Sequence, residues 1–518
     1  MVKMLRAKYA DQTLLLDAGD QFQGTLWFYT FGGIVTAEFM NHIGYDAMGI
    51  GNHEFDEGIE GLEPFARKVT FPLLSSNMNL DNTPKLKDII QKSTVLTVNG
   101  QKIGLVGYTT AETPYISRAE TVTFSKELEA VQAEVDRLTQ QGVNKIIAVG
   151  HVGFPADLDL AKRLRNVDVI VGGHTNTFLY NGTAPSNEVV GGVYPTAVTS
   201  DSGQQVLVVQ GYAYGKYLGE LHVTFNDEGI VTSWWGNPIL LDKSVQQDPE
   251  TLEIIAKYTP AINKQKTTVV GQSYVDLLAD VIKCRTTECN LGNLVADAML
   301  RYNLLHTSDS WSEVSMSVVN AGSFRASINT GNITTEAVIF VQPFRNTVDI
   351  VEVSGQTIKD MFEYCAEKWT ELPDKAYGGF LQVAGLQVTY DVSQPVGSRV
   401  VELLVTCTKC KVPKLEPISA DRDYKLVTSS FILNGGDGLS MFPKEIKSRQ
   451  PRENLDTDIM IKHIVRFSPI TTGLEGRIRH VKLEQKEDTI KGNSAENVRM
   501  RYTLTPVISG IALLLLTQ

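Results

Sequence analysis

The chain has 518 residues, of which 42% are hydrophobic and 21% are charged. Its mean hydropathy of −0.08 argues against a disordered or polytopic membrane protein and favours a soluble protein of about two to four domains. A net charge of −11 would repel a phosphate backbone, which argues against nucleic acid as a partner.

The first half of the chain, from residue 13 to about residue 241, alternates strand-like apolar runs with helical patterns. The predicted strands include residues 13–20, 145–150 and 167–172, and residues 127–141 have four apolar side chains on one helical face. This alternation is typical of a sheet layered with helices, so we expect a mixed α/β fold.

A charged, helix-prone stretch from Asp248 to Lys266, broken by Pro260, predicts a linker before a second series of strands and helices. We therefore expect a catalytic domain over residues 1–244, a linker helix over 245–267, an α+β domain over 268–481 and a C-terminal stretch over 482–518.

The five cysteines indicate two short disulfides. Cys284 is close to Cys289 and Cys407 is close to Cys410, which leaves Cys365 over. A zinc site would need a second pair of ligands at similar spacing, so disulfides are favoured, and these imply an oxidising compartment. Two N-glycosylation sequons agree with that compartment, and they begin at Asn181 and Asn332.

The two ends of the chain differ in their targeting signals. The first ten residues contain no apolar run of signal-peptide length. At the other end, small residues at 492–495 precede a mostly polar spacer and an apolar tail over 507–516, which fits a GPI-attachment signal. The alternative is a terminal helix docked on a core, but such a helix would alternate apolar and polar faces.

Four predicted strands of the first half are each followed closely by a potential metal ligand. These ligands are Asp20, Asn52, His151 and His174. In layered α/β folds, ligands bind outside the carboxyl ends of strands, so we expect the four side chains to converge. Alone, a Gly-His pair is usually a turn, but carboxylate, amide and imidazole at four strand ends together predict a zinc or similar divalent site.

His53 and Asp56 predict a catalytic pair beside that site. They are three residues apart, so one helical turn lets the carboxylate orient the imidazole. A charged imidazole there would stabilise a phosphoryl transition state.

The chain resembles the metallophosphatase-type 5'-nucleotidases, in particular the animal ecto-enzymes of that family. The runs at 14–21, 45–56 and 171–180 carry the resemblance in the first half. It implies a four-layer αββα metallophosphatase domain with two divalent ions, Zn²⁺, of which Asp20 bridges both. Asn52, His151 and His174 complete the second site, and Asn176 lies beside the phosphate or the first ion.

In the second half, the resemblance rests on the runs at 284–293, 319–325, 342–344 and 431–438. It implies that Phe344 and Phe431 sandwich a nucleobase and that Asp437 binds the ribose hydroxyls. The residues that it assigns to holding substrate are Arg285, Asn320 and Arg325. It also implies a homodimer through the C-terminal domain.

The start of the chain departs from the family pattern. The family opens with an Asp-x-His that ligates the first ion, and none of the eight histidines has Asp two positions before it. We therefore expect the first strand, half of one metal site and the secretion signal to be missing together through truncation of the sequence.

The resemblance implies hydrolysis of nucleoside 5'-monophosphates, AMP above all, on the extracellular face of the plasma membrane. Two alternatives stay open. One is an apyrase-type enzyme that also removes phosphate from ADP and ATP. The other is a catalytically impaired, nucleotide-binding surface protein.

Overall fold

The computed structural model describes residues 1–304, 310–370, 372, 375–452, 454–481 and 511–517. The chain forms two units. One comprises Met1–Pro260 with Leu504–Gln518, and the other comprises Ala261–Thr503. The small residues and spacer predicted as a lipid-attachment signal lie outside the described residues.

Two mixed sheets form the centre of the first unit. The strands of the larger sheet, in spatial order, are β14 (Val231–Leu240), β13 (Tyr217–Phe225), β26 (Ile511–Thr517), β1 (Thr13–Asp17), β2 (Ala47–Gly49), β3 (Leu73–Leu74) and β5 (Ile90–Gln91). Those of the smaller sheet are β11 (Thr196–Thr199), β12 (Gln205–Val209), β10 (Val169–Gly172), β9 (Ile146–His151), β7 (Gln101–Thr109) and β6 (Ser93–Val98). A further pair is β4 (Met78–Asn79) with β8 (Thr123–Phe124).

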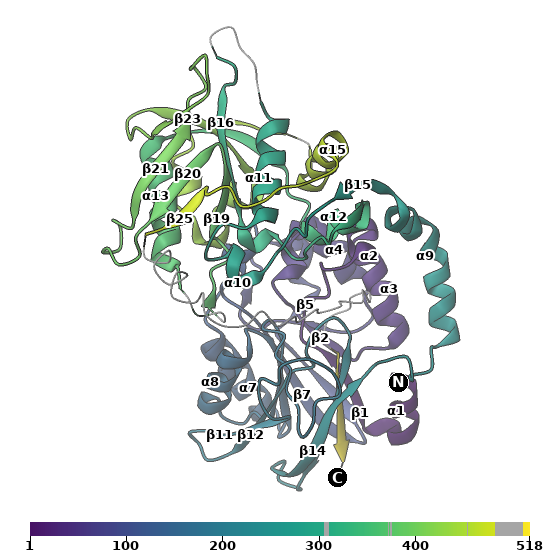
Figure 1. Ribbon diagram of the computed structural model, residues 1–518. Helices are drawn as coiled ribbons and strands as arrows, with labels where there is room; N and C mark the ends of the chain where they lie inside the picture. The colour runs from purple at the N-terminus through teal and green to yellow at the C-terminus, as the bar shows by residue number, and fades with distance from the viewer. Residues whose placement is uncertain (305–309, 371, 373–374, 453, 482–510, 518) are drawn as a thin grey trace, which may run out of the picture. The chain divides into compact units, whose positions relative to one another are not determined.

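Helices cover the outer faces of both sheets. The larger sheet carries α1 (Val2–Tyr9), α2 (Leu26–Phe31), α3 (Gly33–Ile43) and α4 (Gly58–Lys68), and the smaller carries α7 (Glu127–Gln140) and α8 (Phe154–Arg163). Two short helices, α5 (Pro84–Lys87) and α6 (Thr113–Ile116), lie in connections. In Figure 1, α7 and α8 lie on one side of the sheets and α2 and α3 on the other.

Alternation along the strands explains these layers. On β7, Leu105 packs between the two sheets, whereas Val106 and Tyr108 pack against α7 and α8. On β1, Leu15 faces the helices and Leu16 faces the second sheet. Both faces of the central strands β1 and β7 are thus buried, and the predicted αββα architecture is confirmed.

Glycines between the two sheets let their main chains lie in direct contact. A Cβ added to Gly107 would lie 2.3 Å from the carbonyl oxygen of Leu74 in the facing sheet. One added to Gly49 would lie 2.7 Å from the carbonyl oxygen of Val149. No larger residue fits at either position without moving a strand.

The apolar end of the chain forms β26 at a central position of the larger sheet. This strand pairs antiparallel with β1 and parallel with β13, and thereby joins them. The sequence predicts that the missing first strand leaves a position open in the sheet, and it also predicts an apolar tail. The structure places this tail in the larger sheet. No helix in the described part of the chain is long and apolar enough to cross a membrane.

Helix α9 (Pro249–Thr267) links the units in sequence, and the boundary between them follows Pro260. The sequence predicts a break at Pro260, but the helix continues through it. Ile262 is the only buried residue among the described side chains of α9. Because the helix is so exposed, the carbonyl group that Pro260 leaves without a donor can bind water.

The second unit is an α+β domain around one core. Its five-stranded sheet contains β19 (Leu381–Ala384), β16 (Val314–Asn320), β23 (Asp423–Ser429), β18 (Val348–Ser354) and β24 (Ser448–Gln450). Smaller sheets contain β22 (Leu415–Pro417), β21 (Val400–Thr406), β20 (Leu386–Tyr390) and β25 (Ile478–His480), and β15 (Val269–Ser273) with β17 (Gly331–Thr334).

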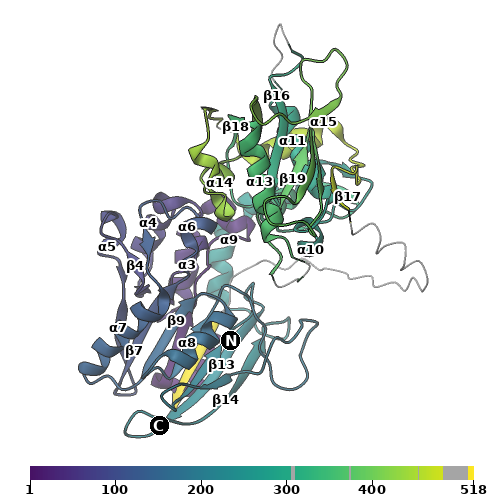
Figure 2. The ribbon, with the colours of Figure 1, turned by 90° about the vertical axis from the view of Figure 1, so that its left-hand side faces the viewer.

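The helices of this unit are α10 (Val281–Cys284), α11 (Asn290–Tyr302), α12 (Thr335–Val341), α13 (Gly355–Lys368), α14 (Ser430–Leu433) and α15 (Asp456–Phe467). Helices α11 and α13 pack against the five-stranded sheet (Figure 2).

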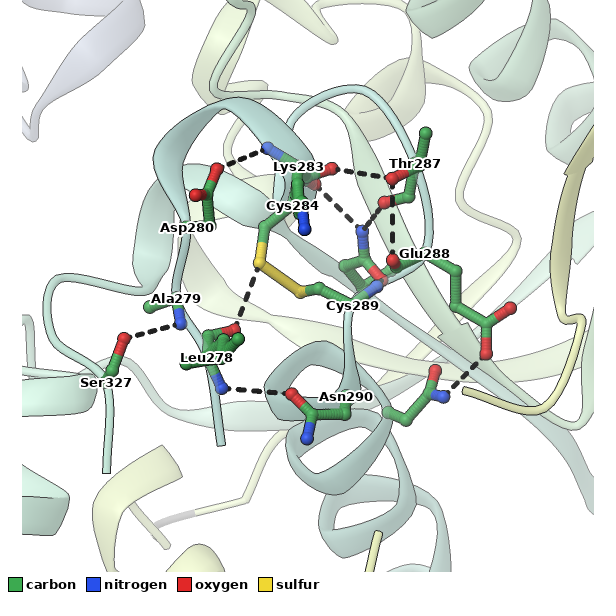
Figure 3. The surroundings of a disulfide bond; sticks show 12 residues. Leu278, Ala279, Asp280, Lys283, Cys284, Thr287, Glu288, Cys289, Asn290 and Ser327 are labelled. Carbon is green, nitrogen blue, oxygen red and sulfur yellow. Dashed lines mark hydrogen bonds between the residues drawn. A yellow bond between two sulfur atoms is a disulfide. The ribbon is translucent and has the colours of Figure 1, made fainter. Parts of the chain in front are cut away.

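Both predicted disulfides are present. Cys284 pairs with Cys289 and Cys407 pairs with Cys410, while Cys365 is a buried free thiol. Figure 3 shows the first disulfide, which joins Cys284, the last residue of the short helix α10, to Cys289, the residue before α11.

Gly107→Ala is expected to lower the free energy of unfolding by about 1–3 kcal/mol, because the main chain of Leu74 cannot yield to the new methyl group. Gly104→Ala on the same strand is the matched control. Its Cβ would meet side-chain atoms and no main chain, the nearest being Cδ1 of Leu138 at 3.0 Å. Equal losses for both variants in chemical denaturation would contradict this account of the sheet packing.

Candidate functional site

The four strand ends singled out in the sequence meet at one edge of the two sheets. Strand β1 is parallel to β2, and β9 is parallel to β10. Asp20 and Asn52 follow the first pair, while His151 ends β9 and His174 follows β10. One ligand atom from each of Asp20, His151 and His174 lies within 4.8 Å of the others.

Short contacts join these side chains. Nε2 of His151 lies 2.8 Å from Oδ2 of Asp20, and Nδ1 of His174 lies 2.9 Å from Oδ1 of Asn52. The main-chain N–H of His53 donates to Oδ1 of Asp20 at 2.9 Å. The structure therefore brings together all four ligand candidates and the first residue of the catalytic pair.

His151 shows that the site fits a cation. Its Nδ1 lies 2.6 Å from the carbonyl oxygen of Ala18, which can only accept, so Nδ1 donates. Nε2 is buried and makes no hydrogen bond among the described residues, although it lies beside the Asp20 carboxylate. A metal ion held by both groups satisfies such an arrangement.

The pKa shifts of the same residues are also compatible with a metal site. Burial, with His151 as a second cause, lowers the pKa of His174 to about 4, so this imidazole is neutral, as a metal ligand must be. Burial raises the pKa of Asp20, but the imidazoles of His151 and His53 outweigh burial and hold it below its usual range. Burial lowers the pKa of His151, but Asp20 outweighs burial and raises it. A bound metal displaces that proton, so affinity should fall as the pH falls.

His53 and Asp56 form the predicted pair. Nδ1 of His53 lies 2.6 Å from Oδ2 of Asp56, with the imidazole 21% exposed and the carboxylate only 5% exposed. Oδ1 of Asp56 accepts a hydrogen bond from Ser117 Oγ at 2.7 Å. The buried carboxylate is thus held from both sides and orients an imidazole that solvent can reach.

Two residues of this region have no role predicted from the sequence. Ser117 lies just after α6 and belongs to no recognisable motif. Glu54 lies between Asn52 and Asp56 in a run that the sequence does mark, and it is fully buried. The only signal in the sequence is that this glutamate lies among the ligand candidates.

Asn176 lines a pocket next to the ligand candidates. The same pocket is lined by Asp20, His151, His174 and Tyr212. Asn176 has a φ of 51° and His174 a φ of 71°, so the loop after β10 holds non-glycine residues in the left-handed region. Such strain is often found at functional sites, where the surrounding structure enforces it.

A second group of predicted residues meets in the C-terminal unit. Nδ2 of Asn320 donates to Oδ2 of Asp437 at 2.9 Å, and the hydroxyl group of Tyr377 donates to the main-chain carbonyl of Asp437. A Cβ on Gly378 would lie 3.8 Å from Oδ1 of Asp437 and 3.9 Å from Cζ of Arg285. Burial raises the pKa of Asp437 to about 6, although Asn320 and Arg285 oppose it.

The two predicted base-binding rings belong to the same unit. The guanidinium carbon of Arg325 lies 5.7 Å from the ring centre of Phe344. Phe431 packs on the glycine turn before Asp437, since a Cβ on Gly436 would lie 2.5 Å from its ring. Their role in stacking stays a prediction.

The two sequons differ in their surroundings. Asn332 is exposed on β17, and its side-chain oxygen accepts a hydrogen bond from the side chain of Gln272 at 3.1 Å. The side-chain nitrogen of Asn181 instead donates to the carbonyl oxygen of Tyr194. Attachment of a sugar would disturb this contact at Asn181.

Comparison with known proteins agrees with this geometry. The family model for calcineurin-like phosphoesterases matches residues 1–178, and that for the 5'-nucleotidase C-terminal domain matches residues 269–444. The 5'-nucleotidase of Rattus norvegicus is 45% identical over 91% of this chain and 82% of its own length. That of Homo sapiens is 44% identical over 90% of this chain and 82% of its own. A crystal structure of a 5'-nucleotidase precursor from Thermus thermophilus is similar, with a TM-score of 0.81 and 35% identity over 93% of this chain and 92% of its own.

His174→Ala is expected to weaken the binding of a divalent metal by at least about tenfold, because it removes one of the four convergent ligand candidates. The measurement is competition between metal-stripped protein and a chromophoric chelator for Zn²⁺. His463→Ala, in α15 of the other unit, is the control. Unchanged affinity in His174→Ala would show that these residues do not form a shared metal site.

Proposed function

The chain belongs to the 5'-nucleotidase family, and from that membership we infer that it hydrolyses AMP to adenosine and phosphate with two Zn²⁺ ions. It is an enzyme of the metal-dependent phosphoesterase class. The observation that carries the proposal is the convergence of Asp20, His151 and His174 beside the His53–Asp56 pair.

Asp20, Asn52, His151 and His174 are the residues that would hold metal. When bound, the ions lower the pKa of a water molecule and bind phosphate oxygens. The donor set fits zinc, because neutral imidazoles and a carboxylate are its usual ligands. Asp20 has two carboxylate oxygens, as a residue that bridges two ions requires.

His53 would stabilise the reacting phosphoryl group. Because Nδ1 faces the Asp56 carboxylate, Nε2 is the ring nitrogen that would donate to a phosphate oxygen. Asp56 orients the imidazole, and Ser117 keeps Asp56 in place. The developing negative charge would then meet an oriented hydrogen-bond donor, and preorganised donors of this kind contribute strongly to phosphoryl-transfer catalysis.

Residues of the C-terminal unit would select the nucleotide. Asp437 is an acceptor for the ribose hydroxyls, and Phe344 and Phe431 offer faces on which a base can stack. In the same unit, the remaining contacts with substrate are assigned to Arg285, Asn320 and Arg325. Asn176, in the first unit, is assigned to the phosphate.

We place the protein at the cell surface, on the extracellular side, with a GPI anchor and as a homodimer through the C-terminal domain. The order of small residues, spacer and apolar tail supports the anchor. Attachment of the lipid anchor removes the apolar tail, and it would therefore remove β26 from the larger sheet. Release of surface protein by a phosphatidylinositol-specific phospholipase tests it, and protein that stays on treated cells contradicts it.

His53→Ala is expected to lower kcat for AMP by at least about 100-fold, because the transition state loses the donor that His53 provides. The measurement is phosphate release by zinc-loaded protein, with His463→Ala as the control. Phosphate release from ADP and ATP at comparable rates would instead favour an apyrase. Nucleotide binding without release from any of the three would favour a non-catalytic surface protein.

A further inference from the structure

The carboxylate of Glu54 accepts hydrogen bonds from the main chain of two loops. These loops follow strands of the larger sheet and carry ligand candidates. Oε1 of Glu54 accepts from the main-chain N–H groups of Gln21 at 2.7 Å and Phe22 at 3.2 Å. Its Oε2 accepts from those of Asp20 at 2.9 Å and Gly51 at 2.7 Å. One fully buried carboxylate thus joins the loop after β1 to the loop after β2.

These bonds act where the loops are closest. A Cβ on Gly51 would lie 2.3 Å from Oδ1 of Asp20 and 2.8 Å from Oε2 of Glu54, so no other residue fits between them. Asp20 has a φ of 63°, in the left-handed region, which needs enforcement by its surroundings. Hydrogen bonds to an ionised carboxylate are stronger than neutral ones, and here they act in a buried setting.

Glu54 is not itself a metal ligand in this arrangement. Both of its oxygens are directed at main-chain N–H groups of the two loops. Asp20, in contrast, presents its side chain to His151 and to the N–H of His53. The carboxylate of Glu54 therefore determines where Asp20 and Asn52 lie relative to each other.

We propose that Glu54 is a positioning residue of the metal centre, whose carboxylate sets the spacing of Asp20 and Asn52 and thereby the affinity for metal. This inference rests on the proposed metal-dependent function. It adds a residue that holds the ligand loops without touching metal or substrate.

The test compares Glu54→Gln with Asp168→Asn. A glutamine keeps the size of Glu54 but turns an NH₂ group toward two N–H donors. Asp168 is the matched control. Its buried carboxylate accepts a hydrogen bond from the main-chain N–H of Ile146 at 2.7 Å. Asp168 precedes β10, so it lies at the end of the strands opposite to the ligand candidates.

Zn²⁺ affinity of metal-stripped protein is measured by chelator competition, together with the melting temperature without metal. We expect Glu54→Gln to lose at least about tenfold in zinc affinity, and Asp168→Asn to keep it even where its melting temperature falls as far. Equal zinc affinity in Glu54→Gln and wild type would overturn this proposal alone. Failure of the wild type to bind zinc would overturn the metal centre as well.

Hydrogen exchange of the metal-free wild type decides the matter even if Glu54→Gln fails to fold. The amide protons of Asp20, Gln21 and Gly51 should be strongly protected before any metal is added. Exchange at the rate of an open loop would refute the role of Glu54.

Discussion

Contact between two sheets at the level of their main chains is the constraint on which the site depends. Gly107 and Gly49 remove the side chains that would hold the sheets apart. The imidazole of His151, at the end of β9, can then donate to the carbonyl oxygen of Ala18 in the loop after β1. A wider spacing would leave the ends of β1 and β2 out of reach of those of β9 and β10.

The same packing explains the electrostatics of the metal centre. Asp20 is half-buried among imidazoles from three segments of the chain, and its pKa falls although burial alone would raise it. His174 stays neutral because it is buried next to another imidazole. Before metal binds, the site therefore already holds an ionised carboxylate and a neutral imidazole, and little reorganisation is needed when a cation enters.

Local patterns in the sequence were enough to predict a sheet layered with helices and the ligand candidates, whereas the four-layer arrangement followed from the family resemblance. Apolar runs and the residues that follow them obey the rule that ligands gather at the carboxyl ends of strands, so Asp20, His151 and His174 could be chosen without coordinates. The three-residue spacing of His53 and Asp56 likewise predicted their contact, which is confirmed.

Contacts between distant segments could not be predicted in this way. Ser117 is 61 residues from Asp56, and no motif marks it. Glu54 lies inside a marked run, but all except one of its main-chain partners belong to a loop more than 30 residues earlier. The pairing of β26 with β1 joins the two ends of the chain. The break predicted at Pro260 is absent, because an exposed helix tolerates an unpaired carbonyl.

Anomalous diffraction at the zinc edge, on crystals of the full chain grown with Zn²⁺, tests the central claim most directly. The account predicts a zinc peak bonded to Asp20, His151 and His174, at about 2.0–2.2 Å from their ligand atoms. Zinc that binds elsewhere, with these side chains still in contact with one another, would contradict it.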